Sequence, residues 1–241
     1  MSQTRLNEVK TINKVLALIL AMLLGALFTL GCTKKSVEQK LAESEAMYLD
    51  KISELTNTIS GMEVELQTKD AEVDRLSTLT EELQSELGVI DTIVEATGLP
   101  KSVALSLYKE TKSTGLELPI VLAIVQTESN FRTDTVNHNT NGTIDVGIMQ
   151  INSCHSAGWQ SKYGEPYTID NVVDPVKNIR FGLELLIGHL NNNNDDLTAA
   201  LTAYNRGQGG MQKLRRNTGS AESSYSRLIY SRADYWRNII S

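Results

Sequence analysis

Hydrophobic side chains recur at alternating spacings of four and three residues from Leu41 to Val94. Thirteen of the sixteen positions in this repeat are apolar, and the positions between them are mostly charged or polar. A 3.5-residue repeat of this length predicts a coiled-coil helix. β-Branched side chains such as Ile52 and Ile59 alternate with leucines, which favours a parallel dimer. We predict that residues 37–97 form a dimeric stalk; the alternative is an ordinary amphipathic helix packed on a globular domain.

The N-terminal segment, residues 1–32, has the pattern of a membrane anchor. Basic residues up to Lys14 precede an uncharged stretch from Val15 to Cys32, as in a secretory signal. Gly31 before Cys32 resembles a lipoprotein processing site, with Cys32 as the lipidated residue. The alternative is an uncleaved helix, since eighteen residues just suffice to span a bilayer. Both interpretations put the rest of the chain outside the cytoplasm, in the periplasm or at the cell surface.

The pattern changes after the predicted stalk, where Gly98 and Pro100 form a helix stop and open a domain at residues 98–241. Ser102 is placed to cap a helix that ends at Gly115. The next helix starts at Pro119 and is apolar nearly all round, so we expect it to be buried. The domain is therefore mainly α-helical.

Glu128 lies at the end of this apolar helix and is the strongest candidate for chemistry. A carboxylate in that position either pairs with a cation or is partly protonated because desolvation raises its pKa. Arg132, one helical turn later, is a possible partner. If Arg132 points away, Glu128 suits general acid catalysis near neutral pH.

Two further polar segments follow. Residues 137–145 are rich in Asn and Gly, and their Asn-Gly pair favours a small β-hairpin. Gly147 would permit close backbone approach to a ligand, and Gln150 offers hydrogen-bond donors and an acceptor. Much later, small residues precede Tyr204 and Asn205 at the end of a helix.

These segments carry a family resemblance. Glu-Ser-Asn-Phe at 128, Gly-Ile-Met-Gln-Ile-Asn at 147 and Ala-Tyr-Asn-Arg-Gly at 203 occur in the order typical of lytic transglycosylases with a lysozyme-like SLT domain. The match covers about 99–230 and includes Asp174-Pro175 and the helix after it. It implies a lysozyme-like (α+β) catalytic domain. The loop at 141–147 is similar to the branch found with secretion and conjugation machines and phages.

The resemblance implies that peptidoglycan glycan strands are the substrate. Glu128 would protonate the glycosidic oxygen between N-acetylmuramic acid and N-acetylglucosamine. As a carboxylate it would then take the proton of the muramic 6-hydroxyl, which attacks the anomeric carbon and leaves a 1,6-anhydro end. One carboxylate would serve both steps, unlike the carboxylate pairs of most glycosidases.

The resemblance also implies a set of substrate-site residues. Tyr225 is preferred to Tyr230 as the late tyrosine of the family. Asp145 is read as a turn residue, with a second carboxylate as the alternative. The full set of expected substrate contacts is Ser129, Asn137, Gly147, Met149, Gln150, Asn152, Tyr204, Asn205 and Tyr225.

Charge and composition limit the classes of partner and cofactor that we expect this protein to bind. Fifteen acidic and four basic side chains lie between residues 38 and 95, whereas the rest of the chain from 101 is near neutral. Nothing resembles a basic nucleic-acid footprint, and no histidine or cysteine spacing suggests a metal or other cofactor. Cys154 is read as a buried hydrophobe or a bystander. After Arg206, six basic residues outnumber two acidic ones, which suits the carboxylates of wall peptides or an ordinary solvated surface.

Two other functions stay open on the sequence. A hydrolase on the same fold would use water, with Asp145 positioning it. A membrane-tethered coiled-coil scaffold would bind glycan without cleaving it.

Overall fold

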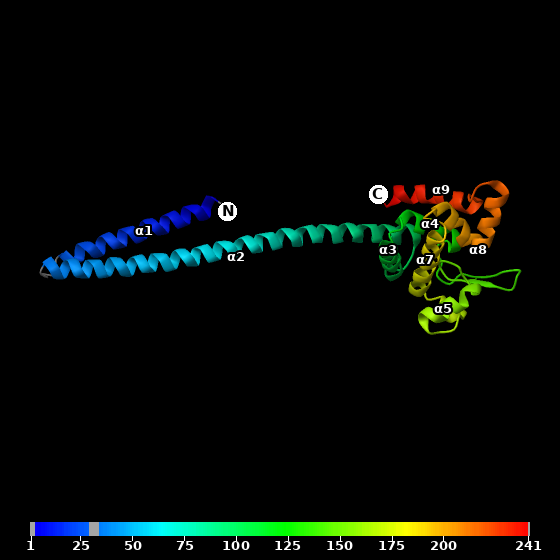
Figure 1. The fold of residues 1–241 in the computed structure, drawn as a ribbon, viewed down its shortest axis with the longest axis horizontal. Helices are drawn as coiled ribbons and strands as arrows, with labels where there is room; N and C mark the ends of the chain where they lie inside the picture. Colours follow the sequence, from blue (N-terminus) through cyan, green and yellow to red (C-terminus); the bar gives the residue numbers. More distant parts are fainter. Residues whose placement is uncertain (1–2, 29–33, 241) are drawn as a thin grey trace. The chain divides into compact units, whose positions relative to one another are not determined.

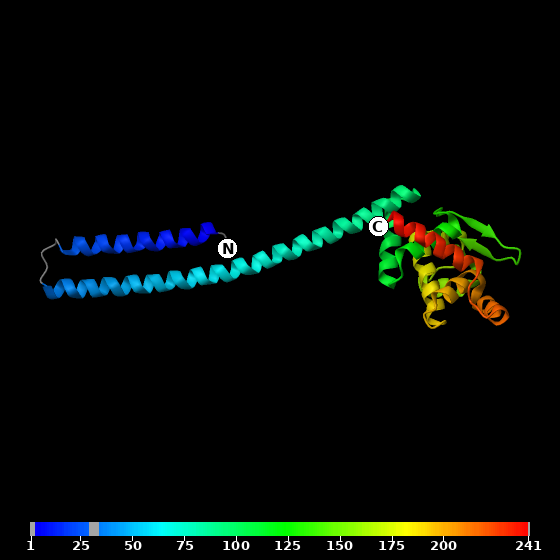
Figure 2. The same ribbon diagram turned by 90° about the horizontal axis from the view of Figure 1, so that it is seen from above.

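A computed structural model describes residues 3–28 and 34–240 of the chain (Figures 1 and 2). The chain divides into two units, residues 1–79 and residues 80–241. Helix α1 (Gln3–Phe28) lies in the first unit, and the 64-residue helix α2 (Lys34–Thr97) continues from the first unit into the second. The predicted long helix over 37–97 is confirmed as α2.

Most of the apolar repeat of α2 is exposed in the described part of the first unit, and the rest is partly exposed. Ile52, Ile59 and Met62 keep 45%, 39% and 64% of their surface exposed. Over residues 3–28 and 34–240, no helix combines the length and apolar character that a membrane crossing requires. The predicted lipidation site Cys32 lies outside the described residues.

The last turns of α2 belong to the second unit and change their environment along the helix. Leu83 and Leu87 are exposed, whereas Ile90 and Ile93 are buried in the hydrophobic core. Gly98 then adopts a positive φ of 71° and ends the helix. The compact unit therefore begins before the glycine stop, because the end of the predicted stalk supplies two of its core residues.

The second unit is mainly helical, as the sequence predicted. Helices α4 and α9 pack together, and α7 lies against both α3 and α8 (Figure 1). A three-stranded antiparallel sheet in the order β1-β2-β3 completes it, with Asn137 opposite Asp145 and Asp145 opposite Asn152. The elements are α3 (Lys101–Thr114), α4 (Leu118–Ser129), β1 (Val136–His138), β2 (Ile144–Val146), β3 (Ile151–Asn152), the 3₁₀ turn η1 (Ser153–His155), α5 (Ser156–Tyr163), α6 (Ile169–Val172), α7 (Pro175–Asn191), α8 (Leu197–Thr218) and α9 (Ser224–Ile239).

Two expected helix starts had different outcomes. Ser102 does not cap α3: the N-cap residue is Pro100, whose carbonyl accepts the amides of Val103 and Ala104, and no side chain caps the helix. Helix α4 begins as expected around Pro119, which lacks an amide hydrogen where a helix cannot use one. Its residues 120–125 are all buried, so Glu128 follows a helix that is fixed on every side.

Helix α9 is held against α4 by its own cap and by side-chain contacts. Ser223 and Ser226 form a capping box at its start, and the buried Thr202 of α8 donates to Ser223 Oγ at 2.9 Å. Near its end, Trp236 Nε1 donates to Gln126 Oε1 at 3.1 Å. These contacts fix the start of α9 on α8 and the end of α9 on α4.

Candidate active site

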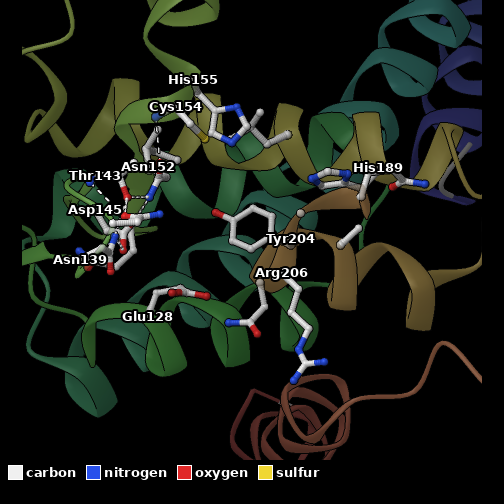
Figure 3. Close-up of a pocket in the computed structure, with 18 residues that line it drawn as sticks. Glu128, Asn139, Thr143, Asp145, Asn152, Cys154, His155, His189, Tyr204 and Arg206 are labelled. Carbon is white, nitrogen blue, oxygen red and sulfur yellow. Dashed lines mark hydrogen bonds between the residues drawn. The ribbon is translucent and has the colours of Figure 1, made fainter. Parts of the chain in front are cut away.

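A cleft of about 670 Å³ runs past the end of α4 in the second unit (Figure 3). Its walls come from the end of α4, the hairpin β1–β2, the segment from Gln150 to His155, α7 and the middle of α8. A volume of this size is typical of small-molecule and oligomer sites. The lining residues are Glu128, Asn139, Asn141, Thr143, Asp145, Gln150, Ile151, Asn152, Cys154, His155, Leu185, His189, Ala203, Tyr204, Asn205, Arg206, Gly207 and Gln208.

Glu128 points into this cleft from the last turn of α4 (Figure 3). Burial, which disfavours the charged form, raises the pKa of Glu128 to about 7; a hydrogen bond from Tyr225 lowers it and the charge of Asp145 raises it. A carboxyl group with this pKa exchanges a proton readily at neutral pH, as an acid or base catalyst must.

Tyr225, in the first turn of α9, donates from its hydroxyl to Glu128 Oε1 at 2.5 Å. Burial and the charge of Glu128 raise the pKa of Tyr225 well above its usual range, so its hydroxyl stays protonated. Tyr230 instead bonds Thr198 Oγ1 at 2.9 Å. Of the two late tyrosines, only Tyr225 contacts Glu128, by holding one carboxyl oxygen.

Arg132 does not pair with Glu128 among the ion pairs of the described residues. Its Nε donates to the carbonyl of Ser129 at 3.3 Å instead. The alternative in which Glu128 is a salt-bridge partner of Arg132 is therefore wrong.

Residues 147–149 are held by the buried Asn178 of α7, and they do not line the cleft. The buried Asn178 accepts from the amide of Met149 at 2.8 Å and donates to the carbonyl of Val146 at 2.8 Å. Gly147 has φ of 84°, and a Cβ there would collide with Asn178. Gly147 is thus required by packing on α7, not by the approach of a ligand as expected, and Met149 is buried away from the cleft surface.

Ser129 and Tyr204 tie the same segment to two helices. Ser129 is buried, and its Oγ donates to the carbonyl of Ile148 at 2.8 Å. Tyr204 lines the cleft, and its hydroxyl donates to the carbonyl of Met149 at 2.9 Å (Figure 3). Ser129 therefore lies behind the cleft surface as a positioning residue, whereas the ring of Tyr204 forms part of the wall.

Gln150 lines the cleft, but its side-chain amide is already engaged. Nε2 donates to the carbonyls of Gly147 and Thr135, and Oε1 accepts from Asn137 at 2.6 Å. The exposed Asn137 is therefore bonded to Gln150, and it is not among the residues that line the cleft. The expected contact between Asn137 and the substrate has no support in this geometry.

Asp145 lies in strand β2, facing the cleft, and is not a turn residue (Figure 3). Its Oδ1 accepts from Asn152 at 2.7 Å and its Oδ2 from Asn139 at 2.8 Å. Asn152 and Asn139 each also bond Thr143. The sheet register explains this cluster, because Asp145 stands directly opposite Asn152.

Six consecutive residues of α8, 203–208, line the cleft. A regular helix turns 100° per residue and cannot present six consecutive side chains to one side. Gly207 breaks α8 with φ of 71° and ψ of 159°. The break turns Gly207 and Gln208 to the same cleft that Tyr204 and Asn205 line before it, and the motif had suggested the last two.

The far end of the cleft contains groups that the motifs did not indicate. His155 and His189 line it, and burial lowers the pKa of both, so both are neutral at neutral pH. Cys154 is exposed at the cleft rather than buried. Gln208 forms a reciprocal amide pair with Asn193. No periodic pattern marks these residues, because they come from η1, α7 and the part of α8 after its break.

Comparison with known proteins agrees with the motifs. The sequence family described as "Transglycosylase SLT domain" matches residues 106–226, just over half of the chain. The chain is 31% identical over 118 residues to membrane-bound lytic murein transglycosylase C of Sodalis glossinidius, covering 44% of this chain and 31% of that protein. It is 32% identical over 116 residues to the protein of the same name from Cronobacter sakazakii, covering 43% and 31%.

The chain thus spans about a third of the length of these curated relatives. Among solved structures, it is similar to an inactive mutant of lytic transglycosylase Slt from Pseudomonas aeruginosa, with 22% identity and a TM-score of 0.41. That match covers 68% of this chain and 27% of the other. On the match over residues 106–226, the chain belongs to the transglycosylase SLT domain family.

Proposed function

We propose that this protein is a peptidoglycan lytic transglycosylase in which Glu128 acts first as the general acid and then as the general base. The observation that carries the proposal is the enclosure of Glu128 in the cleft, which raises its pKa to about 7. The glycosyltransfer needs one group that gives a proton and takes another within one cycle, and a pKa near the working pH favours both directions.

In the first step, protonated Glu128 gives its proton to the oxygen that links N-acetylmuramic acid to N-acetylglucosamine. Tyr225 holds Oε1, so the proton is expected on Oε2. The bond from the anomeric carbon to that oxygen breaks, and the N-acetylglucosamine side leaves with a hydroxyl group.

In the second step, the Glu128 carboxylate accepts the proton of the muramic 6-hydroxyl. That oxygen bonds to the anomeric carbon and closes a 1,6-anhydro ring, which regenerates protonated Glu128 without water. The hydrogen bond that the Tyr225 hydroxyl donates stabilises the Glu128 carboxylate between the two steps.

One observation favours a second candidate, a hydrolase of the lysozyme type. Asp145 lines the same cleft, and its charge contributes to the raised pKa of Glu128. In inverting glycosidases a second carboxylate activates water on the opposite face of the sugar. Both oxygens of Asp145 already accept from asparagines, an arrangement that orients the carboxylate.

Digestion of purified peptidoglycan, followed by mass analysis of the products, separates the two candidates. The transglycosylase leaves anhydro ends, lighter by one water than the reducing ends of a hydrolase. We expect anhydro ends from the wild type and no new ends from Glu128→Gln. Reducing ends alone would refute the transglycosylase, and no new ends from the wild type would leave only glycan binding by a scaffold.

We further propose that the domain works outside the cytoplasm on an N-terminal anchor at residues 1–32, with α2 as a dimeric stalk. The names of the relatives describe membrane-bound enzymes, which supports an envelope location for this chain. The exposed apolar repeat of α2 supports a partner helix. Metabolic labelling with a fatty acid, lost in Cys32→Ser, tests the lipid anchor.

A further inference from the structure

Helix α9 forms hydrogen bonds to three consecutive residues at the end of α4. The pairs, each with the donor from α9, are Tyr225 with Glu128, Arg232 with Thr127, and Trp236 with Gln126. The three donors are seven and four residues apart, so they lie on one face of α9. Two of them are buried and the arginine is partly buried. This face therefore places a guanidinium against the residue that precedes Glu128.

Arg232 is the one arginine of α9 that appears in no ion pair among the described residues. The other two, Arg227 and Arg237, each pair with a carboxylate. Arg232 Nη1 instead donates to Thr127 Oγ1 at 2.9 Å, and that hydroxyl donates to the carbonyl of Ala123 at 2.6 Å. A partly buried cation costs free energy unless it is paired. The packed face of α9 thus holds a positive charge that no carboxylate of an ion pair neutralises.

The end of α4 is a position where a cation is favoured and a carboxylate is not. The C-terminal end of a helix carries a partial negative charge, and Glu128 lies in the last turn of α4. A helical side chain points toward the start of its own helix, which is the direction from Arg232 to Tyr225. Burial and the charge of Glu128 raise the pKa of Tyr225, and the charge of Arg232 lowers it. A more acidic hydroxyl donates a stronger hydrogen bond to a carboxylate.

The other titratable or charged groups around Glu128 come from β2, α8 and the segment after α4. The charge of Asp145 in β2 raises the pKa of Glu128. The hydroxyl of Tyr204 in α8 is protonated, because burial and the charge of Glu128 raise its pKa well above the usual range. Arg132, beyond the end of α4, donates to a backbone carbonyl. The guanidinium of α9 is therefore the cation that acts on the tyrosine hydroxyl bonded to Glu128.

We propose that Arg232 is a positioning residue for Glu128, which acts through Thr127 on the end of α4 and through the Tyr225 hydroxyl on the carboxyl group. The inference rests on the proposed function, in which the Glu128 carboxylate persists until it accepts the muramic proton. Without Arg232, Tyr225 donates a weaker hydrogen bond and Glu128 keeps its proton to higher pH. Arg232 is not among the residues that line the cleft, so its effect does not require contact with the substrate.

The test is a titration of Glu128 in the full chain in detergent, with ¹³C at the glutamate side-chain carboxyls. Arg232→Gln removes the charge and keeps an amide donor. We expect its Glu128 midpoint to lie at higher pH, at about a threefold lower proton concentration, the effect of one partly exposed charge. Arg232→Lys keeps the charge and should keep the wild-type midpoint. The matched control Arg227→Gln, which removes an exposed cation paired with Glu222 on the same helix, should also keep it.

Two further variants test the route through the two hydroxyls. Thr127→Val removes the group that holds the guanidinium but leaves every charge in place, so it should raise the midpoint by a smaller factor than Arg232→Gln. In a Tyr225→Phe background, Arg232→Gln should have no further effect, because the hydroxyl on which the charge acts is absent. An unchanged midpoint in Arg232→Gln, or an equal shift with and without the Tyr225 hydroxyl, would overturn the proposal. If Arg232→Gln does not fold, an unchanged midpoint in Thr127→Val would overturn it.

Failure of the proposed function looks different, because the titration requires no turnover. A wild type that releases no anhydro ends would refute the transglycosylase, whereas the Glu128 midpoints would still report the effect of Arg232. On peptidoglycan, the alkaline limb of the pH–rate profile should move with the midpoint in Arg232→Gln and stay in place in Arg227→Gln. A merely structural role for Arg232 would instead lower the rate by the same factor at every pH.

Discussion

The seam of α2 and the cleft around Glu128 differ in the kind of side chain that they expose to water and the kind that they bury. Along α2, apolar side chains such as Ile52 and Ile59 are exposed to water. In the cleft, a carboxyl group is enclosed and its pKa is raised to about 7. Each feature costs free energy in the isolated chain. In the proposed dimer the seam would recover that energy by pairing with another helix, whereas the cleft would keep its unfavourable carboxyl group for the proposed catalysis.

The two regions also differ in the charged side chains that surround them. Two positions of each heptad, e and g, lie on either side of the seam on the helix surface. From Ile52 to Asp91 they are acidic at six places and basic at none: Glu63, Glu65, Asp70, Glu72, Glu86 and Asp91. Lys69, within the seam, lies 3.5 Å from Glu65 on its own helix. In the proposed dimer, self-pairing would therefore be driven by apolar burial and opposed by repulsion between these acidic side chains. In the cleft, Arg206 is the one arginine or lysine among the described lining residues, and its side chain extends away from the two carboxylates (Figure 3).

The largest effect should come from removing the acid of the cleft. Glu128→Gln keeps the shape of the side chain but cannot exchange a proton. We expect peptidoglycan cleavage to fall by roughly a thousandfold or more, with no change in the self-association of α2. Release of soluble glycan fragments measures the first, and sedimentation the second. Wild-type cleavage by this variant would remove Glu128 from the mechanism.

The second-largest effect should come from a charge placed in the apolar seam of α2. Ile59→Asp places a carboxylate in the centre of the α2 repeat, and we expect dimerisation to weaken on the order of a hundredfold because two charges would be buried together. Ser60→Asp adds the same charge beside the seam and is the matched control. Analytical ultracentrifugation of the full chain in detergent measures both. A dimer of equal strength in Ile59→Asp would place the partner surface elsewhere.

The third prediction concerns the free energy of unfolding that the protein loses because Glu128 is buried in the cleft. The folded chain holds the Glu128 proton up to about pH 7, whereas an ordinary glutamate, with a pKa of 4.5, loses it at lower pH. Ionisation therefore destabilises the fold as pH rises from about 4.5 to 7, by about 3 kcal/mol above that range. Glu128→Gln should thus unfold at higher denaturant than the wild type at pH 8 and at the same denaturant at pH 4. Equal stability at pH 8 would show that Glu128 is not desolvated.

The smallest effect should come from Tyr225→Phe. The hydroxyl of Tyr225 lowers the pKa of Glu128, so its loss should move the alkaline limb of the pH–rate profile to higher pH. The rate should fall roughly tenfold, since one charge-assisted hydrogen bond to the carboxyl is lost. Tyr230→Phe, in the same helix but bonded to Thr198, is the control. A limb that moves to lower pH would contradict the assigned direction.

The two regions also differ in how far the sequence alone predicts them. The seam is a local repeat, so its period is sufficient to predict α2. The buried α4 and the hairpin that carries Asp145 follow in the same way from local patterns. The motifs identified Glu128 and Tyr204 because those short segments are contiguous in sequence.

What the sequence did not predict depends on contacts between distant segments. The resemblance preferred Tyr225 as a site residue, but its hydrogen bond to Glu128, 97 residues away, depends on the packing of α9 on α4. Gly147 suggested a ligand contact, but the buried Asn178 occupies that space. The far end of the cleft, with His155 and His189, is assembled by tertiary packing and has no local pattern.

Direct titration of Glu128 tests the central claim, that the cleft keeps this one carboxyl group protonated near neutral pH. The protein is labelled with ¹³C at glutamate side-chain carboxyls, and the Glu128 signal is assigned as the one missing from Glu128→Gln. The proposed mechanism predicts a Glu128 midpoint near pH 7. A Glu128 midpoint near 4.5 would contradict it.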